Sequence, residues 1–281
     1  MTQKVKRAGL AGKFYPASSS SLRDQVAIYL KNNQPQKNYN NVFAIIAPHA
    51  GYSFSGPTAA YAYNCLKDKS YDNVFIIAPS HSYINTPVGV YDYDQYHIPL
   101  GKIPINKEIV AKLKEYDEID DITQELRPEN SLEVQLPFLS VVLDDFKLVP
   151  ILIRDQSLQM SNRMAHIISN LINDNKNEKN LFVFSSDLSH YHNAAEAEKM
   201  DNLLIEALKE KNLRKLDELI TSGKAEACGF GCIETALALA HKLSIPNLDI
   251  LNYSHSGKIV GNNKQVVGYM SALFYGKSLY V

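Results

Sequence analysis

Four short apolar runs, rich in β-branched and aromatic residues, constrain the fold of this 281-residue chain more than any other feature. None shows the alternation of apolar and polar residues that marks a half-exposed strand, so each predicts a strand buried on both faces. Segments with helical periodicity separate them, which predicts strand–helix–strand units and an α/β fold. The runs are residues 42–47 (VFAIIA), 74–78 (VFIIA), 148–153 (LVPILI) and 181–184 (LFVF).

The rest of the pattern extends this sheet within one domain. Two late runs, 248–253 and 266–274, predict strands that complete the sheet. The polar loops 32–41 and 173–180 are too short to be convincing linkers between domains. We therefore expect residues 1–281 to form a single-domain, layered α/β/α fold with a mainly parallel sheet. The expected helices are residues 22–31, 58–66, 108–116, 160–172, 197–209 and 233–243.

Composition argues against several classes of protein. Twenty-nine Lys plus Arg against thirty Asp plus Glu give a net charge of −1, so no global basic field favours nucleic acid or an anionic membrane as a partner. We expect no membrane span, because no run approaches the roughly 20 apolar residues that one needs, and no signal peptide at the amino terminus. The three cysteines are too few for a disulfide framework, which favours a cytoplasmic protein.

Histidines follow three of the predicted strands at the point where each strand ends. His49 follows run 42–47, His81 follows run 74–78, and Asp187 and His190 follow run 181–184. The loops at the carboxyl ends of parallel strands converge in the crevice where α/β proteins bind their ligands. Imidazole is the commonest protein ligand for transition metals. These strand ends therefore predict a metal site or an acid–base site.

Cys228 lies in a glycine-flanked turn just before a predicted helix. The helix dipole and the free N–H groups at such a position stabilise a thiolate, which could act as a metal ligand or a nucleophile. A structural cysteine is the commoner case. The CxxxC spacing to Cys232 is weak evidence for zinc, because no second pair completes a structural zinc site.

Two further turns supply candidate ligand-binding residues. Asn130 and Glu133 fit a helix N-cap and its partner three residues later, and the alternative is that Glu129 or Asn130 faces the histidine crevice. Gly51 and Tyr52 belong to a small-residue turn that leads into a helix. The N–H groups of that turn could receive an anion or a ligand oxygen. Neither a P-loop nor a GxGxxG pattern is present, so no nucleotide-binding fold is indicated.

Together these motifs resemble the Memo family, whose bacterial and archaeal members are also called AmmeMemoRadiSam system protein B. The resemblance runs nearly from end to end. It implies the α/β fold of the class III extradiol dioxygenases, which are ring-cleaving non-haem iron enzymes. The matching segments are AGKFYP (11–16), APHAGY (47–52), APSH (78–81), ENSLEVQLPF (129–138), SSDLSHY (185–191), ACGFGC (227–232) and VGYMSALF (267–274).

The resemblance also implies roles for single residues. His49 and His81 match two metal-binding histidines, Cys228 matches the metal-binding cysteine, and Asp187 with His190 match further pocket residues. Extradiol dioxygenases combine their two histidines with a carboxylate, so the cysteine here puts ring cleavage in doubt. Two imidazoles and a thiolate suit iron or copper, and zinc also accepts this set.

A second departure from the family concerns Asn130, which stands where the family usually has histidine. An amide cannot shuttle a proton as an imidazole does. If that histidine acts in acid–base chemistry, this protein lacks the step or uses His190 instead.

Three functions are compatible with these residues. The first is an iron- or copper-dependent redox protein or oxygenase acting on an unknown small molecule, in which Asp187 and His190 orient a ligand or move protons. The second is a phosphotyrosine- or peptide-binding adaptor, as described for vertebrate Memo proteins, although six widely spaced arginines give no phosphate-binding motif. The third is a hydrolase with Cys228 as nucleophile and His190 as base. The family name implies radical-SAM system partners, and a homodimer is an open option.

Overall fold

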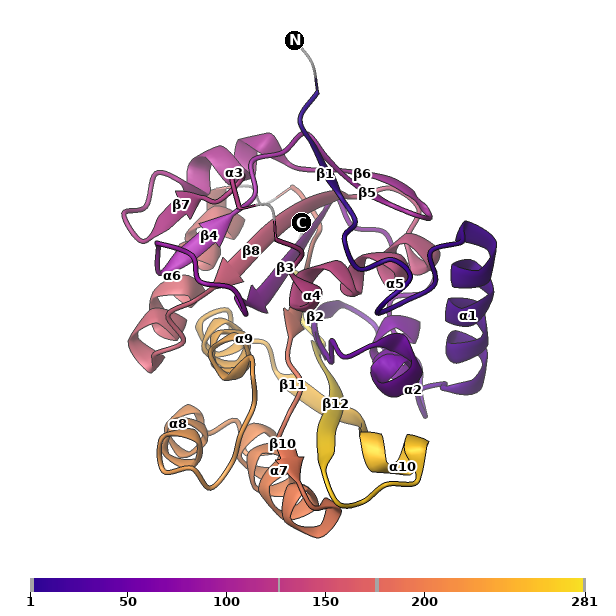
Figure 1. Cartoon of the computed structure of the whole chain (residues 1–281). Helices are drawn as coiled ribbons and strands as arrows, with labels where there is room; N and C mark the ends of the chain where they lie inside the picture. The colour runs from indigo at the N-terminus through magenta and orange to yellow at the C-terminus, as the bar shows by residue number, and fades with distance from the viewer. Residues whose placement is uncertain (1–2, 126, 175–176, 280–281) are drawn as a thin grey trace.

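The computed structural model describes residues 3–125, 127–174 and 177–279, and its centre is a nine-stranded sheet (Figure 1). Four neighbouring strands at the middle of this sheet pair in parallel, and they are given below in their order across the sheet. Their residues are buried on both faces, apart from the first residue of the last strand. This confirms the four strands predicted from the apolar runs. They are β2 (Val42–Ala47), β9 (Asn180–Ser185), β3 (Asn73–Pro79) and β8 (Lys147–Ile153).

Both flanks of the sheet add antiparallel pairs to the parallel centre, so the sheet is mixed. On one side β12 (Val266–Tyr275) runs antiparallel to β2, to β10 (His190–His192) and to β11 (Asn247–His255). On the other side β4 (Val88–Val90) is antiparallel to β8 and parallel to β7 (Ile119–Asp121). The physical reason at the first flank is the short connection from β11 to β12, because only antiparallel neighbours can be joined without a long crossover.

Helices cover both faces of the sheet, and in Figure 1 they stand on opposite sides of it. One layer contains α1 (Ser19–Asn32), α2 (Tyr52–Asn64) and α5 (Gln135–Val142), which pack on one another and, through α2, on β2 and β12. The other layer contains α6 and α9, with α8 and α7 following in series. The members of this layer are α6 (Leu158–Asp174), α9 (Phe230–Lys242), α8 (Leu213–Thr221) and α7 (Ala194–Lys209).

The remaining elements are short. A small sheet pairs β1 (Val5–Arg7) with β5 (Gln95–Ile98) and β5 with β6 (Gly101–Pro104). The sequence did not predict these strands. Residues 175 and 176 of the expected loop 173–180 lie outside the described residues. No helix in the described ranges is long and apolar enough to cross a bilayer. The short helices are α3 (Lys107–Leu113), α4 (Asn130–Glu133) and α10 (Ser256–Val260).

Candidate metal centre

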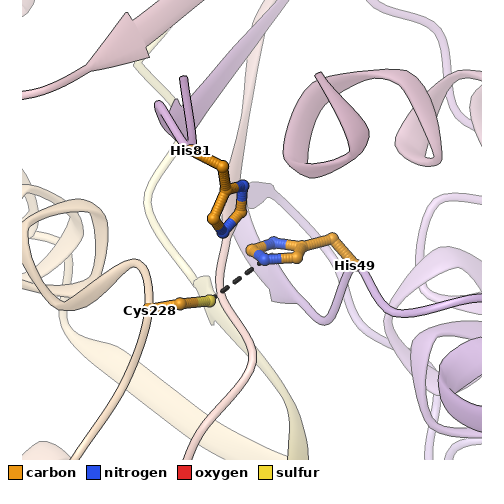
Figure 2. A group of neighbouring side chains, drawn as sticks. All are labelled: His49, His81 and Cys228. Carbon is orange, nitrogen blue, oxygen red and sulfur yellow. Dashed lines mark hydrogen bonds between the residues drawn. The ribbon is translucent and has the colours of Figure 1, made fainter. Parts of the chain in front are cut away.

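Two histidines and a cysteine from three distant parts of the chain meet at the carboxyl edge of the sheet (Figure 2). His49 and His81 lie just beyond the ends of β2 and β3, and Cys228 lies just before α9. The Nε2 atom of His49 is 3.0 Å from Sγ of Cys228, and the three candidate ligand atoms all lie within 4.8 Å of one another. In the described part of the chain, this is the one group of three His, Cys, Asp or Glu residues close enough to hold a metal ion.

A chain of hydrogen bonds fixes the tautomer of His49. Nε2 of Gln135 donates to the Pro48 carbonyl and to Oγ of Ser185, and Oγ of Ser185 donates to the Ser131 carbonyl. Because a hydroxyl has only one proton, Nδ1 of His49, 2.8 Å from Oγ of Ser185, must be the donor in that contact. Nε2 therefore keeps a lone pair, and it faces Cys228.

His81 is oriented by a buried carboxylate. Its Nδ1 is 2.7 Å from Oε1 of Glu129, and its backbone N–H donates to Oε2 of the same side chain at 2.8 Å. Glu129 is only 4% exposed, whereas the side chain of His81 is 40% exposed. A carboxylate that holds Nδ1–H of a histidine directs Nε2 toward a metal and increases its basicity. The exposed side of His81 leaves the site open to solvent.

Three hydrogen bonds hold the turn that carries Cys228. Nε2 of Gln156 donates to the Cys228 carbonyl at 2.8 Å, and Oε1 of Gln156 accepts from the N–H of Gly231 at 2.9 Å. The N–H of Gly229 donates to Oγ of Ser186. A Cβ at position 229 would lie 2.3 Å from a backbone oxygen of β9, so only glycine allows this approach. The thiol of Cys228 is therefore placed by rigid contacts with two strand ends.

Burial and neighbouring charges shift the pKa values of these three groups in different directions. Burial, reinforced by the charge of His81, lowers the pKa of His49 to about 3, so this imidazole is neutral at physiological pH. The hydrogen bond that His81 donates to the Glu129 carboxylate raises the pKa of His81. Burial and then the charge of Asp187 raise the pKa of the Cys228 thiol, which keeps its proton until a cation displaces it.

Asp187 belongs to this centre through the backbone. Its Oδ1 accepts from the N–H of His49 at 2.7 Å, and its carbonyl accepts from the N–H of Cys228 at 3.2 Å. Burial raises the pKa of Asp187 to about 6. His190 lies in β10 outside the three-residue group. Its charge acts to lower the pKa values of His49 and Asp187.

The predicted ligand-binding residues fall in different places. Asn130 faces the centre, since its Nδ2 donates to the His49 carbonyl at 3.2 Å. Gly51 is the N-cap of α2, whereas Tyr52 is 2% exposed and its hydroxyl donates to the Val134 carbonyl inside the core.

The predicted N-cap at Asn130 is wrong by one residue. The N-cap of α4 is Glu129, whose side chain accepts from the N–H of Ser131. Glu133 does not complete a capping box, because its carboxylate accepts instead from the N–H groups of Gly9 and Leu10, far away in the sequence.

Sequence reasoning missed the residues that support the ligands. Gln156 follows the end of β8, so the criterion that selected His49 and His81 could have found it. Ser185 ends β9 and stands in the motif already quoted. Gln135 also stands in a quoted segment, 129–138, but no local pattern indicates that its amide reaches the Pro48 carbonyl and Ser185 at the centre.

The fold and the cluster define an α/β protein with a candidate His–His–Cys metal centre. The family model for Memo-like proteins matches residues 6–273, and the chain belongs to the Memo family.

The chain is similar to MEMO1 family proteins of several organisms. A MEMO1 family protein of Nitrosopumilus maritimus is 31% identical over 96% of this chain and 99% of its own length. One from Thermotoga neapolitana is 32% identical, again over 96% and 99%. One from Saccharolobus islandicus is 33% identical over 94% of this chain and 97% of that protein. An uncharacterized Escherichia coli K12 protein of known crystal structure gives a TM-score of 0.43 at 12% identity, covering 73% of this chain and 86% of that one.

Proposed function

We propose that residues 1–281 form a single cytoplasmic Memo-like domain that binds iron or copper at His49, His81 and Cys228 and uses it in redox or oxygenase-like chemistry on a small molecule. One observation carries the proposal. Both histidines have Nδ1 engaged by a buried partner, Ser185 or Glu129, so their Nε2 lone pairs are left for the space beside Sγ of Cys228.

The donor set fits a transition metal. Metal–ligand distances of about 2.0–2.3 Å place two ligands of a tetrahedral ion roughly 3.3–3.6 Å apart. The 3.0 Å contact and the 4.8 Å limit of this cluster bracket that range, so small side-chain rotations would admit an ion. Two imidazoles and a thiolate favour iron, copper or zinc over magnesium or calcium.

Iron or copper would supply one-electron chemistry at this position. The chain's own residues supply the rest of the site. Glu129 and Ser185 hold the two imidazoles in place, and Asp187 ties the His49 segment to the Cys228 turn. Because burial raises the pKa of Asp187 to about 6, its carboxylate is suited to accept a proton near neutral pH. A substrate would enter from the exposed side of His81.

Metal reconstitution tests this function. The metal-free protein would be loaded anaerobically and separately with Fe(II), Cu(I) and Zn(II), desalted, and analysed for metal per chain. We expect close to one iron or copper ion per chain, with a thiolate absorption band that changes reversibly on oxidation. Cys228→Ala should lose both signals. Cys65→Ala, which changes a buried cysteine of the α2 region, is the matched control and should keep both.

Two results would reject the proposal. One is wild-type protein that retains neither iron nor copper, and the other is a Cys228→Ala protein with the same metal content and spectrum as wild type. Retention of zinc alone would keep the metal site and remove the redox chemistry.

A further inference from the structure

A line of buried aromatic side chains begins at the hydrogen bonds that support His49. Nδ1 of His49 is bonded to Ser185, and Ser185 accepts from Nε2 of Gln135. Oε1 of the same Gln135 accepts from the hydroxyl of Tyr63 at 2.6 Å. Tyr63 is fully buried in α2. A continuous hydrogen-bonded path therefore joins the imidazole of His49 to the phenol of Tyr63.

The line continues through ring contacts. Tyr63 stacks on Phe138 with centroids 4.7 Å apart and planes at 7°. Phe138 lies 5.0 Å from Tyr52, and Tyr52 lies 5.6 Å from Tyr15. All four rings are buried. Ring contacts as close as these are favourable for packing. They also mean that each ring in the line contacts the next one.

The line ends at a buried carboxylate. Oε1 of Glu133 accepts from the hydroxyl of Tyr15 at 2.7 Å, and Oε2 accepts from the hydroxyl of Tyr96 at 2.9 Å. Glu133 is fully buried. The acceptors of the other two phenols are weaker bases, because Tyr63 donates to an amide oxygen and Tyr52 to the carbonyl of Val134.

This difference matters because a phenol is readily oxidised only when a nearby base accepts its proton. A carboxylate accepts that proton within the existing hydrogen bond, whereas an amide or peptide oxygen does not. Within the line, Tyr15 and Tyr96 are therefore the places where an oxidising equivalent would come to rest.

We propose that the tyrosine chain, defined as Tyr63, Phe138, Tyr52, Tyr15 and Tyr96, carries single oxidising equivalents from the metal centre to the Tyr15–Glu133–Tyr96 end. The proposal rests on the redox function proposed above. The tyrosine chain would reduce an oxidant that forms when peroxide reacts at the centre and no substrate is bound. This reduction would protect Cys228 and the two histidines from oxidation.

The step balances with hydrogen peroxide as the oxidant. Its O–O bond breaks, and reduction to two water molecules takes up two electrons and, from solvent, two protons. A bound iron or copper ion would supply one electron, and Tyr15 would supply the other. The phenolic proton of Tyr15 passes to Glu133, which leaves a neutral tyrosyl radical beside a protonated carboxyl.

Spin trapping in wild-type protein tests the proposal without any substitution. Protein loaded with iron or copper would be treated with peroxide and a nitroso spin trap, and the adducts located by peptide mass spectrometry. We expect a tyrosyl signal by electron paramagnetic resonance and adducts on Tyr15 or Tyr96. Tyr15→Phe/Tyr96→Phe protein should show the signal only at the level of metal-free protein.

Tyr39→Phe is the matched control. The hydroxyl of Tyr39 also donates to a carboxylate, that of Asp249, at 2.9 Å, but Tyr39 precedes β2 and so lies toward the opposite end of the sheet. This variant should keep the wild-type signal. Metal content is measured for every sample, so protein that binds no metal reports failure of the proposed function and, with it, of this proposal. Adducts on Tyr39 but not on Tyr15 or Tyr96, or an unchanged signal in a metal-loaded double variant, would overturn the tyrosine chain alone.

Discussion

Buried polar side chains lie at both ends of the central strands, but their hydrogen bonds differ between the two ends. At the amino ends of β3 and β9, Nδ2 of Asn106 donates to Oδ1 of Asn73 at 2.7 Å, and Nδ2 of Asn73 donates to Asn180 and Glu178. These amides bond mainly to one another. At the carboxyl ends, the hydrogen bonds hold the far sides of His49 and His81 and leave their near sides facing Cys228.

The comparison shows that neither burial nor a cavity identifies a site. A hollow of about 570 Å³ opens at the amino end, bordered by Asn73, Tyr71 and Phe146 among others. Its buried amides satisfy each other and so stabilise the strand ends. At the carboxyl end, each of the two histidines is held at Nδ1 and keeps Nε2 on the side of Cys228, an arrangement that suits a metal ion.

The largest effect should come from removing a ligand at the carboxyl end. His81→Ala deletes one of three donors, and we expect it to weaken iron or copper binding by more than about 100-fold, beyond the 10- to 100-fold typical of losing an outer support. Competition with a chromophoric chelator measures this affinity. His166→Ala, on the exposed surface of α6, is the control and should bind as wild type. Equal affinities for the two variants would mean that His81 does not bind the metal.

Removing a support should have a smaller effect at the same end. Ser185→Ala leaves Nδ1 of His49 and Nε2 of Gln135 without their shared partner, so the imidazole can rotate or change tautomer. We expect metal affinity to fall by about 10- to 100-fold. Ser271→Ala is the control, because Ser271 is fully buried and its hydroxyl has no partner among the described residues. A Ser185→Ala protein with unchanged affinity would show that the hydrogen bond does not orient the ligand.

A substitution at the amino ends of the strands should lower the stability of the protein and leave its metal affinity unchanged. Asn73→Leu removes the acceptor of Nδ2 of Asn106 and a donor to the carboxylate of Glu178, which should lower the free energy of unfolding by about 1–3 kcal/mol. Urea unfolding of the metal-free protein measures this change, with the exposed Asn162→Leu of α6 as control. A loss of metal affinity as large as that of Ser185→Ala would contradict the division between the two ends.

The same contrast explains how much could be predicted from the sequence. The buried runs that became β2, β3, β8 and β9 have a local signature, and the order of strands along the chain places His49 and His81 at one edge. Strands β1, β4 and β7 have three residues each, too few to show a period. The parallel pairing that we expected is found among the central strands, but the direction of an outer strand depends on its connection, which periodicity does not reveal.

Side-chain roles were predictable only where they follow from position along a strand. Tyr52 was expected at the ligand, yet the first turn of α2 directs its ring into the core. Glu133 was expected to cap its own helix, yet it bonds to Gly9 and Leu10. In both cases tertiary packing, which no local pattern contains, decides which partner the side chain takes.

The smallest predicted effect concerns a buried carboxyl group that belongs to neither end. Glu234 of α9 is fully buried, its Oε2 accepts from Oγ of Ser161, and its Oε1 has no partner among the described residues. Burial raises its pKa from 4.5 to about 7. Between these two values the folded protein holds a proton that the unfolded chain has released, so this group's contribution to stability is present below about pH 4.5 and is lost as the pH rises to 7.

Glu234→Gln removes this titration, so the variant should gain stability relative to wild type by about 1–2 kcal/mol between pH 5 and pH 8, a value discounted for partial solvent screening. Glu118 provides a control of opposite sign, because its hydrogen bond with Arg163 lowers its pKa. The contribution of Glu118 is present at neutral pH and is lost as the pH falls. Urea unfolding of the metal-free protein across this pH range measures the slope due to Glu234, and measurements extended below the ordinary glutamate pKa of 4.5 measure the slope due to Glu118. If the Glu234→Gln curve stays parallel to wild type, Glu234 titrates alike in the folded and unfolded chains, and the burial of its carboxyl does not make stability depend on pH.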